Sequence, residues 1–259
     1  MSRAGGRTAV LVLTLLLAGC GPVGDPTVAA APAAGPVSPS ASPEVSKAPL
    51  RTAPRIRYPE RGGGRFRTAA AQRPEPPRGT VLRYRVLVEK DITGVSTAGF
   101  AAAVQRTLED PRGWTAGGTL RLRRVGPGQR YDFTIYLATP RTRDRLCRSG
   151  TDAYTSCRNG DRVVLNVARW VKGVPRYGSP LAVYRQYMVN HEVGHRLGHG
   201  HERCPGKGEP APVMQQQTLG LHGCRANAWP YRGGKRYAGH SGAYADPVSP
   251  PDRGVHRPG

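Results

Sequence analysis

The chain has 259 residues and a formal net charge of +22, because 39 Lys and Arg outnumber 17 Asp and Glu. This charge favours an anionic partner, such as lipid headgroups, a cell-wall polymer or an acidic substrate, although a GC-rich genome also produces arginine-rich proteins. No basic cluster is interleaved with aromatic side chains, which argues against nucleic acid as a partner.

Residues 1–19 have the features of a bacterial export signal. Arg3 and Arg7 precede the apolar run 9–18, which is far shorter than the roughly 20 residues of a membrane-spanning helix. The run ends in Leu17-Ala18-Gly19-Cys20, which resembles a lipobox. The resemblance implies that Cys20 is lipidated, becomes the mature N-terminus and anchors the exported protein at the outer face of the cell membrane. The alternative is an ordinary secretory signal with a chance cysteine.

Residues 20–79 are predicted to form a disordered tether. They contain twelve of the 25 prolines, and they offer too few large apolar side chains to offset the entropy of ordering. Residues 236–259 are predicted to be a disordered tail. The remaining residues 80–235 are numerous enough to bury a core, and we expect them to form one monomeric domain.

The first part of this domain is predicted to combine strands with one helix. Residues 81–88 are β-rich and predict a strand, and residues 97–108 predict a helix with Ser96 as its N-cap. The helix face that packs inward is Phe100, Val104 and Leu108. Further strands are predicted at residues 119–125, 131–137 and 162–166. The order of elements indicates an α+β fold with a twisted mixed sheet and one packing helix.

The cysteines of the domain predict two disulfides. Removing Cys20 from the five cysteines leaves Cys147, Cys157, Cys204 and Cys224. An even number in an exported protein indicates disulfide pairing. Three pairings are possible, and the simplest prediction is the local one, which joins 147 to 157 and 204 to 224.

A second helix is predicted after Gly178, with Ser179 as its cap and Pro180 in its first turn. Its inward face is Leu181, Tyr184, Met188, His191 and His195. These residues are three or four positions apart, so they lie on one side of a helix. Two histidines therefore extend an apolar face that points into the protein.

The eleven residues from His191 to His201 match the pattern HExxHxxGxxH. On a helix His191 and His195 lie about 6 Å apart, so both rings can reach one ion. Glu192 is rotated by about 100° from His191 and can address a bound water as general base. The pattern predicts one Zn²⁺ held by His191, His195 and His201, with Glu192 as the catalytic residue.

Three other residues bear on this prediction. Gly198 is expected to end the helix and return the chain, so that His201 is the third ligand and His199 a loop residue. Met214 is the candidate for the methionine that metzincins place below the metal, and the alternative for Met214 is an ordinary core residue. Gln216 stands where some metzincins have a ligand tyrosine, which makes a fifth protein ligand doubtful.

Four segments carry a resemblance to a known family, namely residues 83–88, 110–118, 157–166 and the zinc motif. Over residues 80–232 the chain resembles an uncharacterised family of exported actinobacterial proteins with a metzincin-like domain. The resemblance implies a zincin-type fold with a small irregular C-terminal subdomain. It names no substrate.

The expected function is zinc-dependent hydrolysis of a peptide or protein substrate at the cell surface. Residues 151–158 are expected to line the substrate cleft, and activity should fall in mild acid because the histidines must be neutral to bind metal. The alternative is a non-catalytic surface lipoprotein that zinc stabilises and that binds an anionic wall polymer.

Overall fold

A six-stranded mixed sheet lies at the centre of the computed structural model, which describes residues 55–73, 79–148 and 152–255. Its strand order is β2-β3-β5-β7-β6, with β4 beside β3. The strands are β2 (Phe66–Thr68), β3 (Thr80–Glu89), β4 (Leu120–Arg124), β5 (Phe133–Ala138), β6 (Cys157–Asn159) and β7 (Arg162–Asn166). Strands β3, β4, β5 and β7 run parallel, whereas β2 and β6 are antiparallel to their neighbours.

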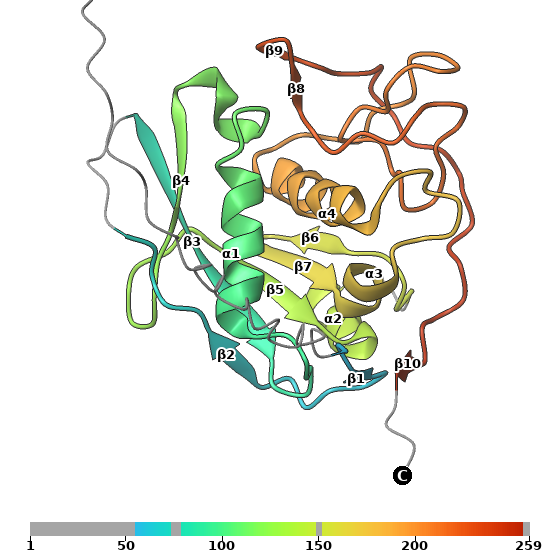
Figure 1. Cartoon of the computed structure of the whole chain (residues 1–259). Helices are drawn as coiled ribbons and strands as arrows, with labels where there is room; N and C mark the ends of the chain where they lie inside the picture. The colour runs from blue at the N-terminus through green and yellow to red at the C-terminus, as the bar shows by residue number, and fades with distance from the viewer. Residues whose placement is uncertain (1–54, 74–78, 149–151, 256–259) are drawn as a thin grey trace, which may run out of the picture. The chain divides into compact units, whose positions relative to one another are not determined.

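Helices cover both faces of this sheet unequally (Figure 1). The helices are α1 (Thr97–Leu108), α2 (Pro140–Cys147), α3 (Val167–Lys172) and α4 (Leu181–Arg196), with the 3-10 helix η1 (Trp114–Gly117) after α1. Helices α1, α3 and α4 contribute to the main hydrophobic core, while α2 packs on a smaller cluster of the opposite face. Among the described helices, none combines the length and apolar character needed to span a membrane.

The predicted packing helix is confirmed as α1. The Ser96 hydroxyl accepts a hydrogen bond from the Gly99 amide at 2.9 Å, which is the expected N-cap. Phe100, Val104 and Leu108 are at most 1% exposed, so the predicted face is the buried one. The mixed α+β architecture is confirmed with it.

One local prediction is wrong, and two helices were missed. Ser179 does not cap α4, because the N-cap is Pro180 and no side chain bonds there. Helices α2 and α3 were not predicted. The first begins at Pro140, shortly after the predicted strand 131–137, and its residues PRTRDRLC have no apolar stripe. The second has only six residues, too few for a periodic signal.

The folded part extends beyond the predicted residues 80–235, which corrects the boundaries of the tether and the tail. Residues 55–73 include β1 (Tyr58–Pro59) and β2. Residues 236–255 include all of β10 (Gly254–Val255) and the end of β9 (Lys235–Arg236), which pairs with β8 (Tyr231–Arg232). β1 pairs with β10, and β2 pairs with β3. Backbone pairing and Tyr58, which is 1% exposed, stabilise segments whose composition alone indicates disorder. Residues 1–54, including Cys20, lie outside the described residues.

Half-buried Asp252 connects the C-terminal segment to the rest of the fold. Its carboxylate accepts a hydrogen bond from the Tyr58 hydroxyl at 3.2 Å and pairs with Arg169 at 3.2 Å and Lys172 at 2.8 Å. The pKa of Asp252 is lowered: burial raises it, but the hydrogen bonds from Lys172 and the Gly254 amide and the charges of Lys172 and Arg169 prevail. One carboxylate thus joins β1, α3 and the tail.

Candidate metal centre

The C-terminal end of α4 positions the histidines. The helix ends at Arg196, and Gly198 has φ of +95°, a left-handed conformation that glycine adopts without strain. The His199 amide then donates to the Gly194 carbonyl at 3.0 Å. This turn brings the chain back toward the helix, as the position of Gly198 in the sequence predicts.

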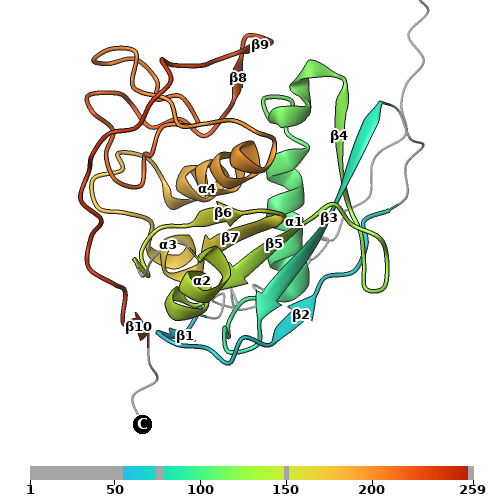
Figure 2. The same cartoon turned by 180° about the vertical axis from the view of Figure 1, so that it is seen from behind.

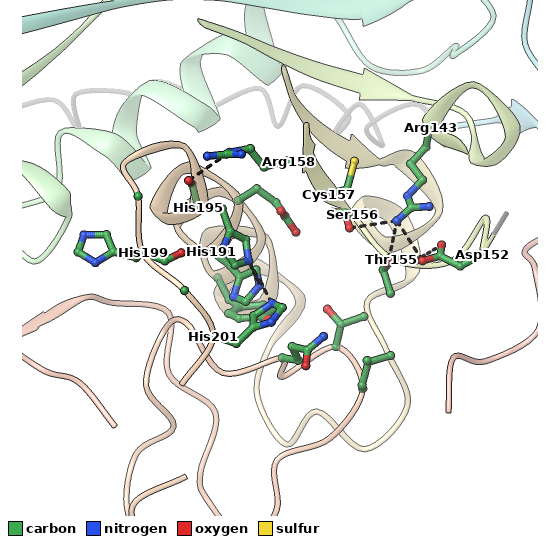
Figure 3. Close-up of a pocket in the computed structure, with 17 residues that line it drawn as sticks. Arg143, Asp152, Thr155, Ser156, Cys157, Arg158, His191, His195, His199 and His201 are labelled. Carbon is green, nitrogen blue, oxygen red and sulfur yellow. Dashed lines mark hydrogen bonds and ion pairs between the residues drawn. The ribbon is translucent and has the colours of Figure 1, made fainter. Parts of the chain in front are cut away.

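His191, His195 and His201 converge on one point (Figure 3). Their nitrogen atoms lie within 4.8 Å of one another, an arrangement that can hold a metal ion. The Nε2 atom of His195 lies 3.2 Å from that of His191 and 3.1 Å from that of His201. The structure therefore brings together the three ligands that the sequence predicts.

Backbone carbonyls fix two of these rings in the tautomer that binds metal. His191 Nδ1 lies 2.9 Å from the Val213 carbonyl, and His195 Nδ1 lies 2.8 Å from the His199 carbonyl. A carbonyl oxygen only accepts, so each Nδ1 must carry the proton and donate it. In the neutral ring Nε2 then has a free electron pair, directed at the cluster.

Burial keeps the three rings neutral. Desolvation lowers the pKa of His191 well below 6.5, lowers that of His195 and brings that of His201 to about 4. The neighbouring histidines lower the pKa of His191 and His201 further. At neutral pH the rings therefore offer lone pairs rather than positive charges.

Glu192 lies beside this cluster without belonging to it. It lines the same cavity and is 6% exposed. Burial raises the pKa of Glu192 to about 8, with the charge of Arg143 opposing and that of Asp152 reinforcing the shift. A cation at the histidines would favour the carboxylate form, which can accept a proton.

The cavity has a volume of about 510 Å³ and two different walls. One wall comes from α4 and the loop after it. The other comes from the segment leading into β6, including Asp152, Thr155 and Arg158, which agrees with the expectation that residues 151–158 line the cleft. Arg158 Nε donates to the His195 carbonyl at 3.2 Å and links the two walls.

Arg143 organises the second wall, and the sequence did not single it out. Arg143 is 2% exposed. Its guanidinium donates to the Asp152 carboxylate at 3.0 Å and to the Thr155 hydroxyl at 2.7 Å (Figure 3). It also pairs with Asp144 at 3.1 Å. The arginines at positions 141, 143 and 145 make the helix look exposed, so only the nearby cysteine signalled a packed segment.

Met214 packs directly against the metal-binding helix. It is 0% exposed, and its sulfur and the Trp114 ring fill the space where a Cβ on Gly194 would lie. The preceding residue, Val213, supplies the carbonyl that orients His191. Gln216 lines the cavity, and its Oε1 is buried with no hydrogen-bond partner among the described residues.

His199 lies apart from the cluster. Its ring stacks on Trp114, with centroids 4.3 Å apart. In Figure 3 the ring points away from the other three histidines. Its role is packing of the loop, as expected.

The local disulfide pairing is confirmed. Cys147 bonds to Cys157, and Cys204 bonds to Cys224. The first bridge joins α2 to β6 at the cavity, and the second encloses the residues around Met214. Two such bonds indicate an oxidising environment outside the cytoplasm.

Comparison with curated proteins and with solved structures finds no match to this chain. A family model does match, with the description "protein of unknown function (DUF3152)", over residues 52–232. The matched range begins near the first described strand and includes all three clustered histidines, Glu192 and Met214. Because the match covers more than half of the chain, the protein belongs to the DUF3152 family.

Proposed function

We propose that this protein is a zinc-dependent hydrolase of peptide bonds that acts outside the cytoplasm. The observation that carries the proposal is the convergence of three neutral histidines beside a buried glutamate, at the base of a cavity bordered by an edge strand. The same features favour a metzincin-like fold as the finer description of this α+β architecture.

The histidine cluster fits zinc by its chemistry. Three imidazole nitrogens are a common catalytic zinc set, and they leave a coordination position for water or substrate. Bound there, zinc would polarise a carbonyl group and acidify a water molecule. The carbonyls behind His191 and His195 would hold both rings toward the ion.

Glu192 is the proposed general base. Its position on α4, one residue after His191, keeps it within the cavity and outside the ligand set. In its carboxylate form it would accept a proton from the attacking water and deliver it to the leaving amine. Burial strengthens this role, because a carboxylate of raised pKa is a stronger base.

Strand β6 is the proposed guide for the substrate. It pairs with β7 on one side only and ends the strand order of the sheet. An extended peptide can add to such an edge through main-chain hydrogen bonds. The shared cavity with His191 would then place a backbone carbonyl near the metal.

The proposed location is the outer face of the cell membrane. The disulfides indicate an extracytoplasmic environment, and the motif ending in Cys20 resembles a lipobox. Lipidation of Cys20 would leave the folded part on a segment of about 35 residues. A mature protein with unmodified Cys20 at its N-terminus would contradict the anchor without affecting the hydrolase proposal.

The test pairs metal content with digestion of a peptide library. Wild-type protein should contain about one zinc per chain and cleave. Glu192→Gln should retain the zinc and lose cleavage by about 10²–10⁴-fold. Glu209→Gln, which changes an exposed glutamate in a nearby loop, is the matched control and should behave like wild type.

Two results would contradict the proposal. Equal cleavage by wild type and Glu192→Gln would show that Glu192 is not the base. A zinc-loaded wild-type protein that leaves the library uncut would favour the alternative function, a zinc-stabilised lipoprotein without catalysis.

A further inference from the structure

Four arginines line up across two parallel strands of the sheet. Arg83 and Arg85 of β3 are two residues apart, so their side chains leave the same face. The register pairs Arg83 with Arg123 and Val81 with Arg121. Paired residues of neighbouring strands point to the same side, so β4 adds two arginines to those of β3.

The row of arginines continues on the same face of the sheet, across β5 to β7. Arg85 pairs with Thr134 of β5, and Thr134 pairs with Arg162 of β7. The Arg85 Nε donates to the Thr134 hydroxyl at 2.9 Å, so this arginine lies over β5. We call the five residues the arginine face: Arg83, Arg85, Arg121, Arg123 and Arg162.

No helix of the described residues covers this part of the sheet. Core residues on β3 alternate with the arginines and pack toward α1 and α4. On the arginine side only the opposite end is covered, where α2 packs on Leu87, Tyr136 and Val164. Figure 2 shows this side, with α2 at one end and β4 without a covering helix.

Within the described part of the chain, no carboxylate side chain pairs with the arginine face. Among the described residues, none of its guanidinium groups forms an ion pair, whereas Arg141, Arg143 and Arg169 elsewhere each have a carboxylate. Asp132, at the border, accepts a hydrogen bond from the Arg83 backbone amide at 2.6 Å. Arg83 and Arg121 are exposed, and the other three arginines of the face are half-buried. The face therefore presents positive charge to solvent.

We propose that the arginine face binds a linear polyanion with phosphate groups along its length. Neighbouring strands are about 4.8 Å apart and alternate residues about 6.7 Å apart, so the guanidinium groups form a ladder rather than a single pocket. A planar guanidinium binds two oxygens of one phosphate, and a polymer can use several such contacts at once. This binding is separate from the proposed hydrolysis.

The surroundings favour a polymer over a membrane or the bases of a nucleic acid. The large apolar side chains exposed in the described part are Tyr131 and Val248. The guanidinium of Arg85 lies 3.8 Å from the centre of the Tyr131 ring and covers it. The face thus offers neither apolar groups for insertion into a bilayer nor a free ring for stacking on bases.

The test measures binding of inorganic polyphosphate to the full-length chain over a series of salt concentrations. The triple variant Arg83→Gln, Arg121→Gln and Arg123→Gln should bind at least tenfold more weakly. The slope of log Kd against log salt should fall by about 2, at about 0.7 for each lost phosphate contact. Replacing the same three residues by Lys should restore most of the salt-dependent binding, which excludes misfolding as the cause.

The matched control removes three exposed cations elsewhere, in Arg106→Gln, Lys207→Gln and Lys235→Gln. It should bind polyphosphate as wild type does. Equal weakening in both triple variants would overturn the proposal, because net charge alone would then explain binding. Binding to anionic phospholipid vesicles that depends on the arginine face, without binding to polyphosphate, would also overturn it in favour of a membrane surface.

Discussion

The two walls of the cavity are built in opposite ways. The wall that α4 provides takes three histidines and a glutamate from eleven consecutive residues. The wall around β6 depends on Arg143 from α2, which holds Asp152 and Thr155 of a later loop. The histidines and Glu192 therefore come from one short stretch of sequence, whereas the polar wall opposite them is assembled from separate segments.

The α4 wall carries the residues that could bind metal, whereas the β6 wall maintains the shape of the cavity. The histidine wall is fixed by helix periodicity and by Gly198, and its second contacts are backbone carbonyls that any residue could supply. The β6 wall is fixed by side-chain ion pairs and by the bond between Cys147 and Cys157. Substitutions of the three histidines in the first wall should therefore remove metal, and substitutions in the second wall should reduce stability.

The largest effect is expected from His195→Ala, which removes the central ring of the cluster. This variant should lose most of its metal, because His195 Nε2 is the nitrogen nearest to both other ligands. Metal content of the purified protein is the measurement. His199→Ala is the control on the adjoining loop and should keep its metal; equal loss in both variants would mean that the loop fold, rather than coordination, governs retention.

Arg143→Met should reduce the free energy of unfolding by about 3–5 kcal/mol, because it leaves carboxylates of a buried ion pair without their partner. Asp144 is 8% exposed at its side chain and cannot regain full hydration. Denaturant unfolding would measure the loss. Arg141→Met removes a half-exposed arginine from Glu60 at 2.9 Å and from a longer 3.5 Å contact with Asp144, and it should cost less than about 1 kcal/mol because Asp144 keeps Arg143. Similar losses would contradict the assigned role of Arg143.

Gly194→Ala tests the contact between α4 and Met214. A methyl group there would overlap the Met214 sulfur and the Trp114 ring, so we expect a loss of about 1–3 kcal/mol from overpacking. Met214→Leu keeps the volume and should cost less than about 1.5 kcal/mol. Thermal unfolding of both variants would rank their losses of stability. A larger loss of stability for Met214→Leu than for Gly194→Ala would show that the sulfur matters beyond packing.

A pH dependence of stability is also expected in the metal-free chain. The folded-state pKa of Glu192 is raised to about 8, so the stability that protonated Glu192 contributes is present below its unfolded pKa and is lost as pH rises through about 8. Glu192→Gln cannot ionise and should gain stability relative to wild type between about pH 5 and pH 9. The histidines are common to both chains and cancel; a constant difference across this range would refute the raised pKa.

The lowered histidine pKa values change the expected acid limit. Ordinary histidines would lose metal near pH 6.5, as the sequence suggests. The pKa of His201 is about 4, and those of His191 and His195 are also lowered. Protons should therefore compete with the metal only in stronger acid.

The sequence predicted what depends on short-range periodicity. The α1 face, the α4 histidines, the turn at Gly198 and both disulfides follow from spacings of three to twenty residues. Arg143 could not be found in this way, because its partners are polar and its helix lacks an apolar stripe. The ends of the folded part were also missed. β1 pairs with β10, which lies near the other end of the chain, and no local pattern in the sequence reveals such a pairing.

The pairing of β1 with β10 has a mechanical consequence. The first described residues are held at two points. Arg57 pairs with Thr93 through two backbone hydrogen bonds of 3.0 and 2.9 Å, and β1 is held by β10 and by the contact of Tyr58 with Asp252. A pull on this segment would therefore be shared between the loop after β3 and the C-terminal residues, at an end of the fold away from α4 (Figure 1).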